Sequence, residues 1–310
     1  MTESPAAKPL TFGVNVRRAS EAAAFRDEVL AAERGGMDVL AMPDHLGAPA
    51  PFALLAAAAA VSTRLRLRTY VLNTYFWNPA LLAREVATLD ALSGGRFELG
   101  LGAGHMKSEH DDAGLPFPPH ARRVAQTEEL LADVRRRLAD PDHVPAPVQR
   151  PVPVVLGGWG PRMLALAARH ADVVAVTGAE QVRGAPPGVF RLASFTEADE
   201  RLAMLADRLA DRAADRPADA APPVVDALLQ QVVVDRPPEQ AAEEFAAAIR
   251  AAGRDADVGE LLATPFVLYA PTPEDAAAEL LRRRDRWGIT SWSTHAASGP
   301  ALSEVAAQFR

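Results

Sequence analysis

Short apolar runs alternate with longer helix-forming stretches along almost the whole chain. The apolar runs are rich in β-branched residues, which favour strands, and they lie at residues 11–16, 38–42, 65–72, 97–102, 152–158, 172–178, 228–234 and 289–295. Stretches rich in Ala, Leu, Glu and Arg follow them, at 20–35, 51–62, 78–92, 120–139, 160–170, 197–214, 237–251 and 272–287. A strand followed by a helix, repeated this often, predicts a closed parallel (β/α)8 barrel, because an open doubly wound sheet rarely contains so many units.

The length of the chain agrees with one such barrel. We predict a single domain over residues 11–310, preceded by a disordered segment at residues 1–10, since 310 residues of which 49% are hydrophobic can bury a core of this size. Two connections are longer than a barrel requires, at residues 106–120 and 179–196. Because connections from strand to helix lie on the catalytic rim, we expect these two to form lids.

Charge and composition limit the partners and the chemistry. The net charge of −7 leaves no basic face for the phosphates of a nucleic acid, and the lack of cysteine excludes disulfides and thiolate chemistry. Lys107 is the single internal lysine, which disfavours Schiff-base chemistry. The first ten residues lack a signal-peptide core, and the longest apolar run, at 52–61, is too short to cross a bilayer. We therefore expect a cytoplasmic protein with no membrane partner.

Two glycine-rich stretches follow predicted strands and raise the question of nucleotide binding. A dinucleotide fingerprint needs G-x-G-x-x-G between a strand and a helix. Gly100, Gly102 and Gly104 are spaced G-x-G-x-G instead, and the stretch at 156–163 carries Met163 at the third position. The second stretch still runs from a strand into a helix. It predicts either a tight turn with close helix packing or an anion site of backbone N–H groups that suits a phosphate.

Five segments together resemble the luciferase-like monooxygenase superfamily, and more narrowly its branch of coenzyme F420-dependent oxidoreductases. They are GGMDVLAMPDH at 35–45, the run at 69–104 that ends in LDALSGGRFELGLGAG, SEHDDAGLPF at 108–117, VVLGGWGPRMLALAARHADVVAVTG at 154–178 and PTPEDAAAELLRRRDRWGIT at 271–290. The resemblance covers the chain from residue 11 onward. The run at 69–104 is found in flavin-using and deazaflavin-using members alike, whereas the loop at 108–117 favours the F420 branch.

The resemblance implies a (β/α)8 barrel with a flavin-like ring system across its carboxyl-terminal mouth. It also implies a cis peptide between Tyr70 and Val71 that supports the ring. It places His45, preceded by Asp44, beside the reactive centre of the cofactor, where an imidazole can exchange a proton with a substrate. The residues alone also permit ordinary trans wall residues at 70 and 71, and a His45 that only hydrogen-bonds a carbonyl group at the strand end.

His105 occupies the position at which sugar-phosphate dehydrogenases similar to this chain carry a catalytic glutamate. An imidazole can also exchange protons near neutral pH, so we expect His105 to face the pocket. We expect the glycines before it, Gly100, Gly102 and Gly104, to end the strand and let cofactor or substrate approach. The difference argues against a sugar-phosphate substrate, as does the scarcity of lysines that would hold its phosphate. The alternative is a solvated hinge histidine at the base of a lid.

The other predicted site residues form two groups. The resemblance implies a cofactor group that comprises Asp44, Tyr70, Val71, Gly104, Gly158, Trp159, Gly160, Thr177 and Gly178. The substrate group comprises Asn73, Tyr75, Trp77 and His295, with Asn78 beside them. Trp159 is alternatively a packing residue under a lid, and the aromatic cluster at 75–77 is alternatively part of the core. The remaining histidines, His110, His120, His143 and His170, lack the spacing of ligands, so we predict no metal site.

The leading hypothesis is a coenzyme F420-dependent oxidoreductase that transfers hydride between the deazaflavin and a small organic substrate, with His45 and His105 handling the proton. Two histidines and no carboxylate at the mouth favour reduction of an activated double bond in specialised metabolism. The alternatives are an FMN-dependent monooxygenase supplied by a separate flavin reductase, and a non-catalytic flavin-binding protein. Members of the superfamily commonly dimerise, and the Ala-rich helices at 51–62 and 78–92 allow close approach, so we expect a homodimer.

Overall fold

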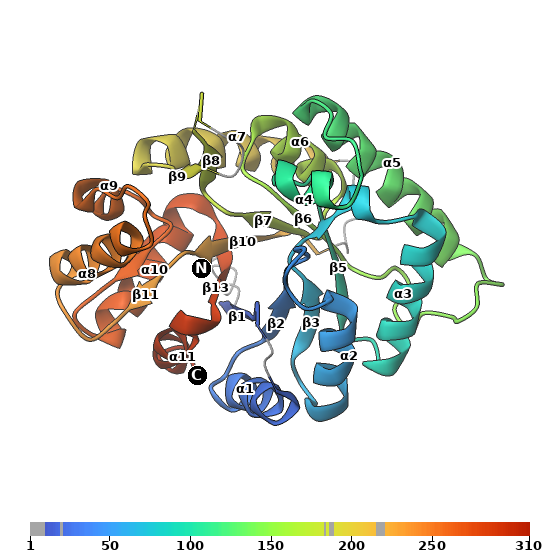
Figure 1. The fold of residues 1–310 in the computed structure, drawn as a ribbon. Coiled ribbons are helices and arrows are strands. Elements are labelled where there is room, and N and C mark those ends of the chain that lie inside the picture. The colour runs from blue at the N-terminus through green and yellow to red at the C-terminus, as the bar shows by residue number, and fades with distance from the viewer. Residues whose placement is uncertain (1–9, 19–20, 183, 186–188, 215–220) are drawn as a thin grey trace, which may run out of the picture.

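The structure is a computed structural model that describes residues 10–18, 21–182, 184–185, 189–214 and 221–310. One sheet in this part of the chain contains only parallel pairings. Its strands are β1 (Thr11–Asn15), β2 (Val39–Met42), β3 (Arg66–Thr69), β4 (Leu72–Asn73), β5 (Phe97–Gly102), β6 (Val154–Gly157), β7 (Val173–Val176), β10 (Val224–Leu229) and β13 (Ile289–His295). They follow the order β3-β2-β1-β13-β10-β7-β6-β5-β4, and an added pairing of β3 with β5 closes the ring. The predicted barrel is confirmed (Figure 1).

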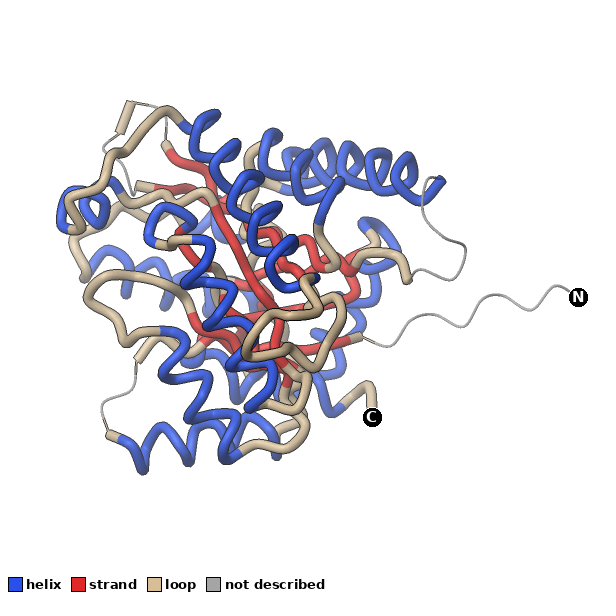
Figure 2. The backbone as a smooth tube through the Cα atoms, turned by 90° about the vertical axis from the view of Figure 1, so that its right-hand side faces the viewer, coloured by secondary structure: helices blue, strands red, loops and turns tan. Residues whose placement is uncertain are grey.

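The eight predicted helices form and surround the ring of strands (Figure 2). They are α1 (Ala22–Arg34), α2 (Pro51–Val61), α3 (Pro79–Leu92), α5 (His120–Ala139), α6 (Pro161–His170), α7 (Phe195–Ala214), α8 (Pro238–Ala251) and α10 (Pro273–Trp287). Five of them begin with proline in the first turn, where the missing N–H has no helical partner to lose. The Asn78 side chain caps α3 by accepting the backbone N–H of Ala80, and Thr272 caps α10 through the N–H of Asp275.

Both long connections contain elements that the sequence pattern does not predict. The first holds α4 (Lys107–Asp112), and the second holds the antiparallel pair β8 (Ala179–Gln181) and β9 (Phe190–Leu192). Further unpredicted elements are η1 (Thr74–Phe76), α9 (Val258–Leu262), β12 (Leu268–Tyr269), η2 (Ala296–Ser298) and α11 (Gly299–Ala307). Of the expected disordered segment at 1–10, residues 1–9 lie outside the described part of the chain.

The seventh strand starts earlier than predicted. The barrel strand β10 covers Val224–Leu229, and the predicted run at 228–234 instead joins its end to β11 (Val232–Val233), which pairs with β12 outside the barrel. The cause is Asp226, whose charge interrupts the apolar pattern although its side chain is completely buried. A buried carboxylate requires partners, and these come from inside the barrel.

The interior of the barrel is held by a polar network around Asp226. One carboxylate oxygen of Asp226 accepts a hydrogen bond from the Tyr70 hydroxyl at 2.8 Å, and the other accepts one from Ser291 at 2.6 Å. Arg68 donates to Glu98 at 2.6 Å and lies 3.6 Å from Asp226. Since β3 and β10 are not neighbours in the ring, these contacts cross the interior. The network lies below the mouth and fixes the side chain of Tyr70.

Candidate active site

The peptide between Tyr70 and Val71 is cis, as the resemblance implies, and it lies between β3 and β4. Glycines in β5 give this junction room. A Cβ atom on Gly100 would lie 1.8 Å from the carbonyl oxygen of Thr69, and one on Gly102 would lie 2.5 Å from Cγ2 of Val71. Any side chain there would overlap these atoms. The protein itself therefore fills the space at Gly100 and Gly102, which corrects the expectation that these glycines admit cofactor or substrate.

Gly104, which follows β5, makes room for the residue that ends β4. Its φ of +68° lies in the left-handed region that favours glycine, and a Cβ atom would lie 2.5 Å from Oδ1 of Asn73. Gly104 thus lies against the side chain of Asn73, a predicted substrate residue that is itself buried.

Asp44 holds the residues that follow β4. Its Oδ2 atom accepts hydrogen bonds from Nε1 of Trp77 at 2.9 Å and from the backbone N–H of Asn73 at 3.2 Å. Burial raises the pKa of Asp44 although these two donors act in the opposite direction. Asp44, which precedes His45 in the sequence, therefore fixes the positions of Asn73 and Trp77.

Asn73 connects this segment to the first long connection. Its Nδ2 atom donates to Nε2 of His110 at 3.1 Å, so the ring of His110 carries its proton on Nδ1, which donates to the carbonyl oxygen of Pro116 at 2.7 Å. His110 is completely buried and touches the ring of Tyr75, with centroids 5.4 Å apart. This histidine, which the sequence leaves outside the site, fixes the loop above it.

His45 is paired with a carboxylate that the sequence analysis missed. Nδ1 of His45 lies 2.8 Å from Oε1 of Glu109 in α4, and the two side chains are 22% and 13% exposed. The carboxylate keeps the proton on Nδ1 and leaves Nε2 of His45 for exchange with another group. The expectation of a mouth without a carboxylate is therefore wrong. Glu109 lies in a connection predicted as a lid, and it follows His105 by four positions in the sequence, a spacing that could have pointed to it.

His105 lies beside His45 as predicted, with the two rings edge to face and their centroids 5.5 Å apart. On its other side it touches Phe190 of β9 at 5.2 Å. His105 has exposed surface, yet protein atoms surround most of its ring. This burial, followed by the charges of His45, Arg17 and Arg123, lowers the pKa of His105 to about 4. His105 is therefore neutral at neutral pH.

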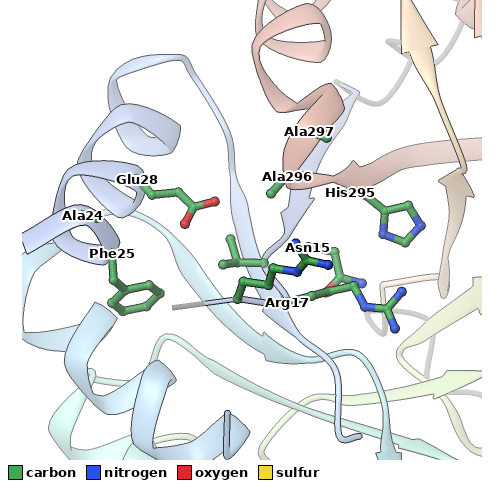
Figure 3. Close-up of a pocket in the computed structure, with 10 residues that line it drawn as sticks. Asn15, Arg17, Ala24, Phe25, Glu28, His295, Ala296 and Ala297 are labelled. Atoms are coloured by element: carbon green, nitrogen blue, oxygen red, sulfur yellow. The ribbon is translucent and has the colours of Figure 1, made fainter. Parts of the chain in front are cut away.

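His295 ends β13 and faces a cavity of about 450 Å³. Its Nε2 atom lies 3.3 Å from Oε1 of Gln230. Burial, together with the charge of Arg17, lowers the pKa of His295 to about 4. Arg17 lines the cavity and acts on both His295 and His105, which places the cavity at the same mouth (Figure 3). Its volume is in the range of small-molecule sites, although neither His45 nor His105 is part of its lining.

The predicted phosphate turn is tightly packed at its first two residues. Gly158 donates its N–H to the carbonyl oxygen of Ala175 at 3.0 Å, and a Cβ atom on it would lie 2.5 Å from Cγ of Met163. Trp159 is 3% exposed and packs edge to face on Phe266, with centroids 5.1 Å apart. These contacts correspond to the alternative of close helix packing with Trp159 as a packing residue.

The remaining residues of the predicted cofactor group differ in how much space lies beside them. Gly160 is open, because a Cβ atom on it would meet only His120, at 3.6 Å. Gly178 has a φ of +62°, and its missing side chain makes room for the ring of Phe266. Thr177 accepts the N–H of Ala179 through its hydroxyl at 3.4 Å. Of the turn and the strand end next to it, Gly160 is the position with space for a ligand.

The aromatic residues after β4 do not all line the mouth. The Trp77 ring packs edge to face on Phe52 at 5.2 Å and belongs to the edge of the outer core. Tyr75 lies half-buried over His110. Trp77 thus matches the alternative of a core residue, while Tyr75 stays near the loop that carries Glu109.

The described residues contain neither a cluster of metal ligands nor a helix that could span a membrane. No group of three or more His, Asp or Glu side chains lies close enough together there to hold a metal ion. None of the helices in that part of the chain combines the length and the apolar character needed to span a bilayer.

The chain matches the model of a known protein family over nearly its full length. The model of the luciferase-like monooxygenase family matches residues 9–304. An F420-dependent glucose-6-phosphate dehydrogenase of Intrasporangium calvum is 32% identical over 171 residues, which are 47% of this chain and 51% of that protein. The curated relatives are covered over 31% to 54% of their own lengths.

Solved structures agree on the fold. An F420-dependent secondary alcohol dehydrogenase in complex with an F420-acetone adduct superposes with a TM-score of 0.75 at 17% identity, covering 98% of this chain and all of that one. A monooxygenase from Streptomyces bottropensis superposes with a TM-score of 0.69 at 20% identity, covering 95% and 98%. Fold, cis junction and family model lead to the same assignment, and the chain belongs to the luciferase-like monooxygenase family.

Proposed function

We propose that this protein is an oxidoreductase that binds coenzyme F420 at the barrel mouth and transfers hydride between the deazaflavin and a small organic substrate. The observation that carries the proposal is the cluster of His45, Glu109 and His105 at the carboxyl ends of the strands, where barrel enzymes place their chemistry. Curated relatives named as F420-dependent dehydrogenases support the choice of cofactor.

The mouth offers a flavin-like cofactor both space and hydrogen-bond acceptors. A cavity of about 450 Å³ lies at the rim, and two buried polar atoms there have no protein partner in the described structure, Oδ1 of Asn15 and Nδ1 of His295. When bound, the deazaflavin would supply two-electron hydride chemistry with little reactivity towards oxygen. Its proposed contacts are the cis junction of Tyr70 and Val71, the end of the strand at Thr177, and the open position at Gly160, which would serve its phosphate.

His45 is proposed to exchange the proton that accompanies hydride transfer, through its Nε2 atom. Glu109 holds Nδ1 of the ring and so orients Nε2 for this exchange. His105, which is neutral, would contact substrate or cofactor from the adjacent side. Tyr75 and His295 are proposed to bound the substrate together with Asn73, which Asp44 fixes in place.

The expected preference for reduction depended on a mouth without a carboxylate. Glu109 removes that basis, because a histidine paired with a glutamate takes a proton from an alcohol as readily as it gives one to a carbonyl. We therefore propose a reversible proton relay that serves both directions of hydride transfer.

The proposal is tested by titrating the purified protein with F420 and, in parallel, with FMN. We expect F420 to bind, with quenching of its fluorescence, and F420H2 to be oxidised without oxygen by an activated enone such as cyclohex-2-enone. Binding of FMN alone, with turnover that requires oxygen and a flavin reductase, would contradict the proposal and support the monooxygenase alternative. Binding of neither cofactor would also contradict it.

A further inference from the structure

Two buried polar atoms without a protein partner lie side by side at the rim of the barrel. Asn15 and His295 are register partners at the ends of the adjacent parallel strands β1 and β13, so their side chains lie on the same face of the sheet. Oδ1 of Asn15 and Nδ1 of His295 are buried and have no hydrogen-bond partner among the described residues. Asn15 is 3% exposed, and both residues line the cavity of Figure 3. Buried polar atoms without partners are rare, and a pair at a rim indicates a ligand.

The protonation of His295 follows from its neighbour. Nε2 of Gln230 donates to the carbonyl oxygen of Thr177 at 3.4 Å, which turns Oε1 of Gln230 towards His295. The Nε2 atom of His295 therefore carries the proton, and its Nδ1 atom is a bare acceptor. Burial and the charge of Arg17 keep the ring neutral, since they lower the pKa of His295 to about 4. The pair thus consists of two acceptors.

The charge around the pair narrows the class of ligand. Arg17 and Arg18 line the same cavity, and Glu28 lies on its opposite side, on α1. Burial raises the pKa of Glu28. Even when it is charged, this single carboxylate leaves the two arginines in excess. Two arginines beside two acceptors oppose a cationic donor such as an ammonium group and favour an uncharged one.

We propose that Asn15 and His295 form a subsite that accepts hydrogen bonds from a hydroxyl or amide N–H group of an uncharged substrate. The term substrate rests on the function proposed above; the hydrogen-bonding preference rests on the two atoms alone. A site built to satisfy such a donor discriminates strongly against an analogue without it, because the acceptors are then left buried and unpaired. The subsite would therefore select hydroxylated or amide-bearing compounds over ketones or ethers of the same shape.

The test compares three compounds that share one ring. Cyclohexanol offers an uncharged donor, cyclohexanone only an acceptor, and cyclohexylammonium a charged donor; each is titrated into the full chain without cofactor and followed by NMR chemical shifts. We expect cyclohexanol to bind about tenfold more tightly than the other two, the effect of roughly one hydrogen bond. The Nδ1 resonance of His295 should move with cyclohexanol and not with cyclohexanone. Equal affinities in the wild-type protein would mean that water fills the site, and would overturn the proposal.

Variants assign the preference to the two residues. Asn15→Leu and His295→Phe are expected to abolish it, whereas Glu28→Gln, which alters the same cavity, should retain it. A preference that survives both substitutions would overturn the proposal. If a variant does not fold, as judged by circular dichroism, the wild-type protein alone tests the proposal: its His295 Nδ1 resonance must shift with cyclohexanol and not with cyclohexanone.

A final arm separates substrate from cofactor as the source of the donor. The titrations are repeated with F420 bound, and we expect the preference for cyclohexanol to persist. Loss of that preference, together with F420 binding weakened about tenfold by Asn15→Leu, would assign the donor to the cofactor and overturn the substrate subsite. Because the first titrations need no cofactor, failure of F420 to bind would contradict the proposed function and leave the subsite result standing.

Discussion

Oε1 of Glu109 lies 2.8 Å from Nδ1 of His45, so a carboxylate on a short helix of the first long connection meets a histidine that follows the second strand. The contact spans 64 positions of the sequence. It connects the proposed proton carrier to a segment that covers the mouth, and any movement of α4 changes the environment of His45.

Substitution of His45 or Glu109 is expected to slow turnover. His45→Ala should lower kcat by roughly 100-fold or more, the usual effect of losing a general acid or base. Glu109→Gln should lower it less, because the amide oxygen that replaces the carboxylate can still accept a hydrogen bond from Nδ1 of His45. Both are measured as F420H2 oxidation by cyclohex-2-enone. Asp111→Asn, on the same helix, is the control and should leave the rate unchanged; unchanged rates in all three variants would refute the assigned roles.

Acidification is expected to destabilise the fold through His105 and His295. Both have a pKa lowered to about 4, whereas an unfolded histidine titrates near 6.5, so between these values the unfolded chain binds more protons. Stability is therefore full above about pH 6.5 and is lost as the pH falls towards 4, by at most about 1.4 kcal/mol per pH unit for His295. Urea unfolding at a series of pH values measures this. His295→Asn should flatten the dependence, and an unchanged slope in that variant would contradict the burial argument.

Enlarging Gly102 is expected to destabilise the barrel by about 1–3 kcal/mol, because its Cβ atom would lie 2.5 Å from Cγ2 of Val71. Val71→Ala removes that atom and should recover much of the loss in the double variant Gly102→Ala/Val71→Ala. Gly160→Ala, with 3.6 Å to its nearest neighbour, serves as the control. Thermal unfolding gives the comparison. If the two effects at 71 and 102 simply add, the close contact is not the cause.

Asp226→Ala is expected to lower the free energy of unfolding by about 3–5 kcal/mol. The substitution leaves the buried cation of Arg68 with one partner fewer and the Tyr70 hydroxyl unpaired. Asp226→Asn keeps the shape and should cost less. Chemical denaturation measures both against Asp111→Ala, which breaks an exposed pair with Lys107 and should have little effect. Equal stability of Asp226→Ala and wild type would show that the network does not support the barrel.

We expect a homodimer that uses the outer surface of α2 and α3. Leu81 and Leu92 of α3 are 51% and 65% exposed and would supply apolar area to such an interface. Leu81→Asp and Leu92→Asp should then yield monomers in light scattering, while Leu262→Asp, at an exposed leucine of α9, should not. A monomeric wild-type protein would exclude the dimer.

The sequence predicts most of the framework because apolar periodicity follows the outer core. All eight helices form where composition indicates, and the strands do so except β10, whose central Asp226 is satisfied only by residues far away in the sequence. Such long-range partners leave no local signal. The role of the glycines in β5 was missed for the same reason, because their spacing does not reveal that Thr69 and Val71 lie against them.

The site was predictable to a similar extent. The resemblance located the cis junction and the pair of histidines, which the structure places together. Glu109 was missed because no regular structure was expected in its connection, and Asn15 was missed because a buried amide at a strand end resembles any other wall residue until its partners are known. Trp77, in turn, is drawn into the outer core by Phe52.

The methyl groups of Val71 occupy space left by two glycines on different strands, Gly102 and Gly157. Three separate stretches of the chain are thereby interlocked at one side chain. A change that widens the mouth at this wall has to alter all three stretches together. A larger binding chamber is therefore easier to obtain by changing the connection that carries α4 than by changing the strands of the barrel.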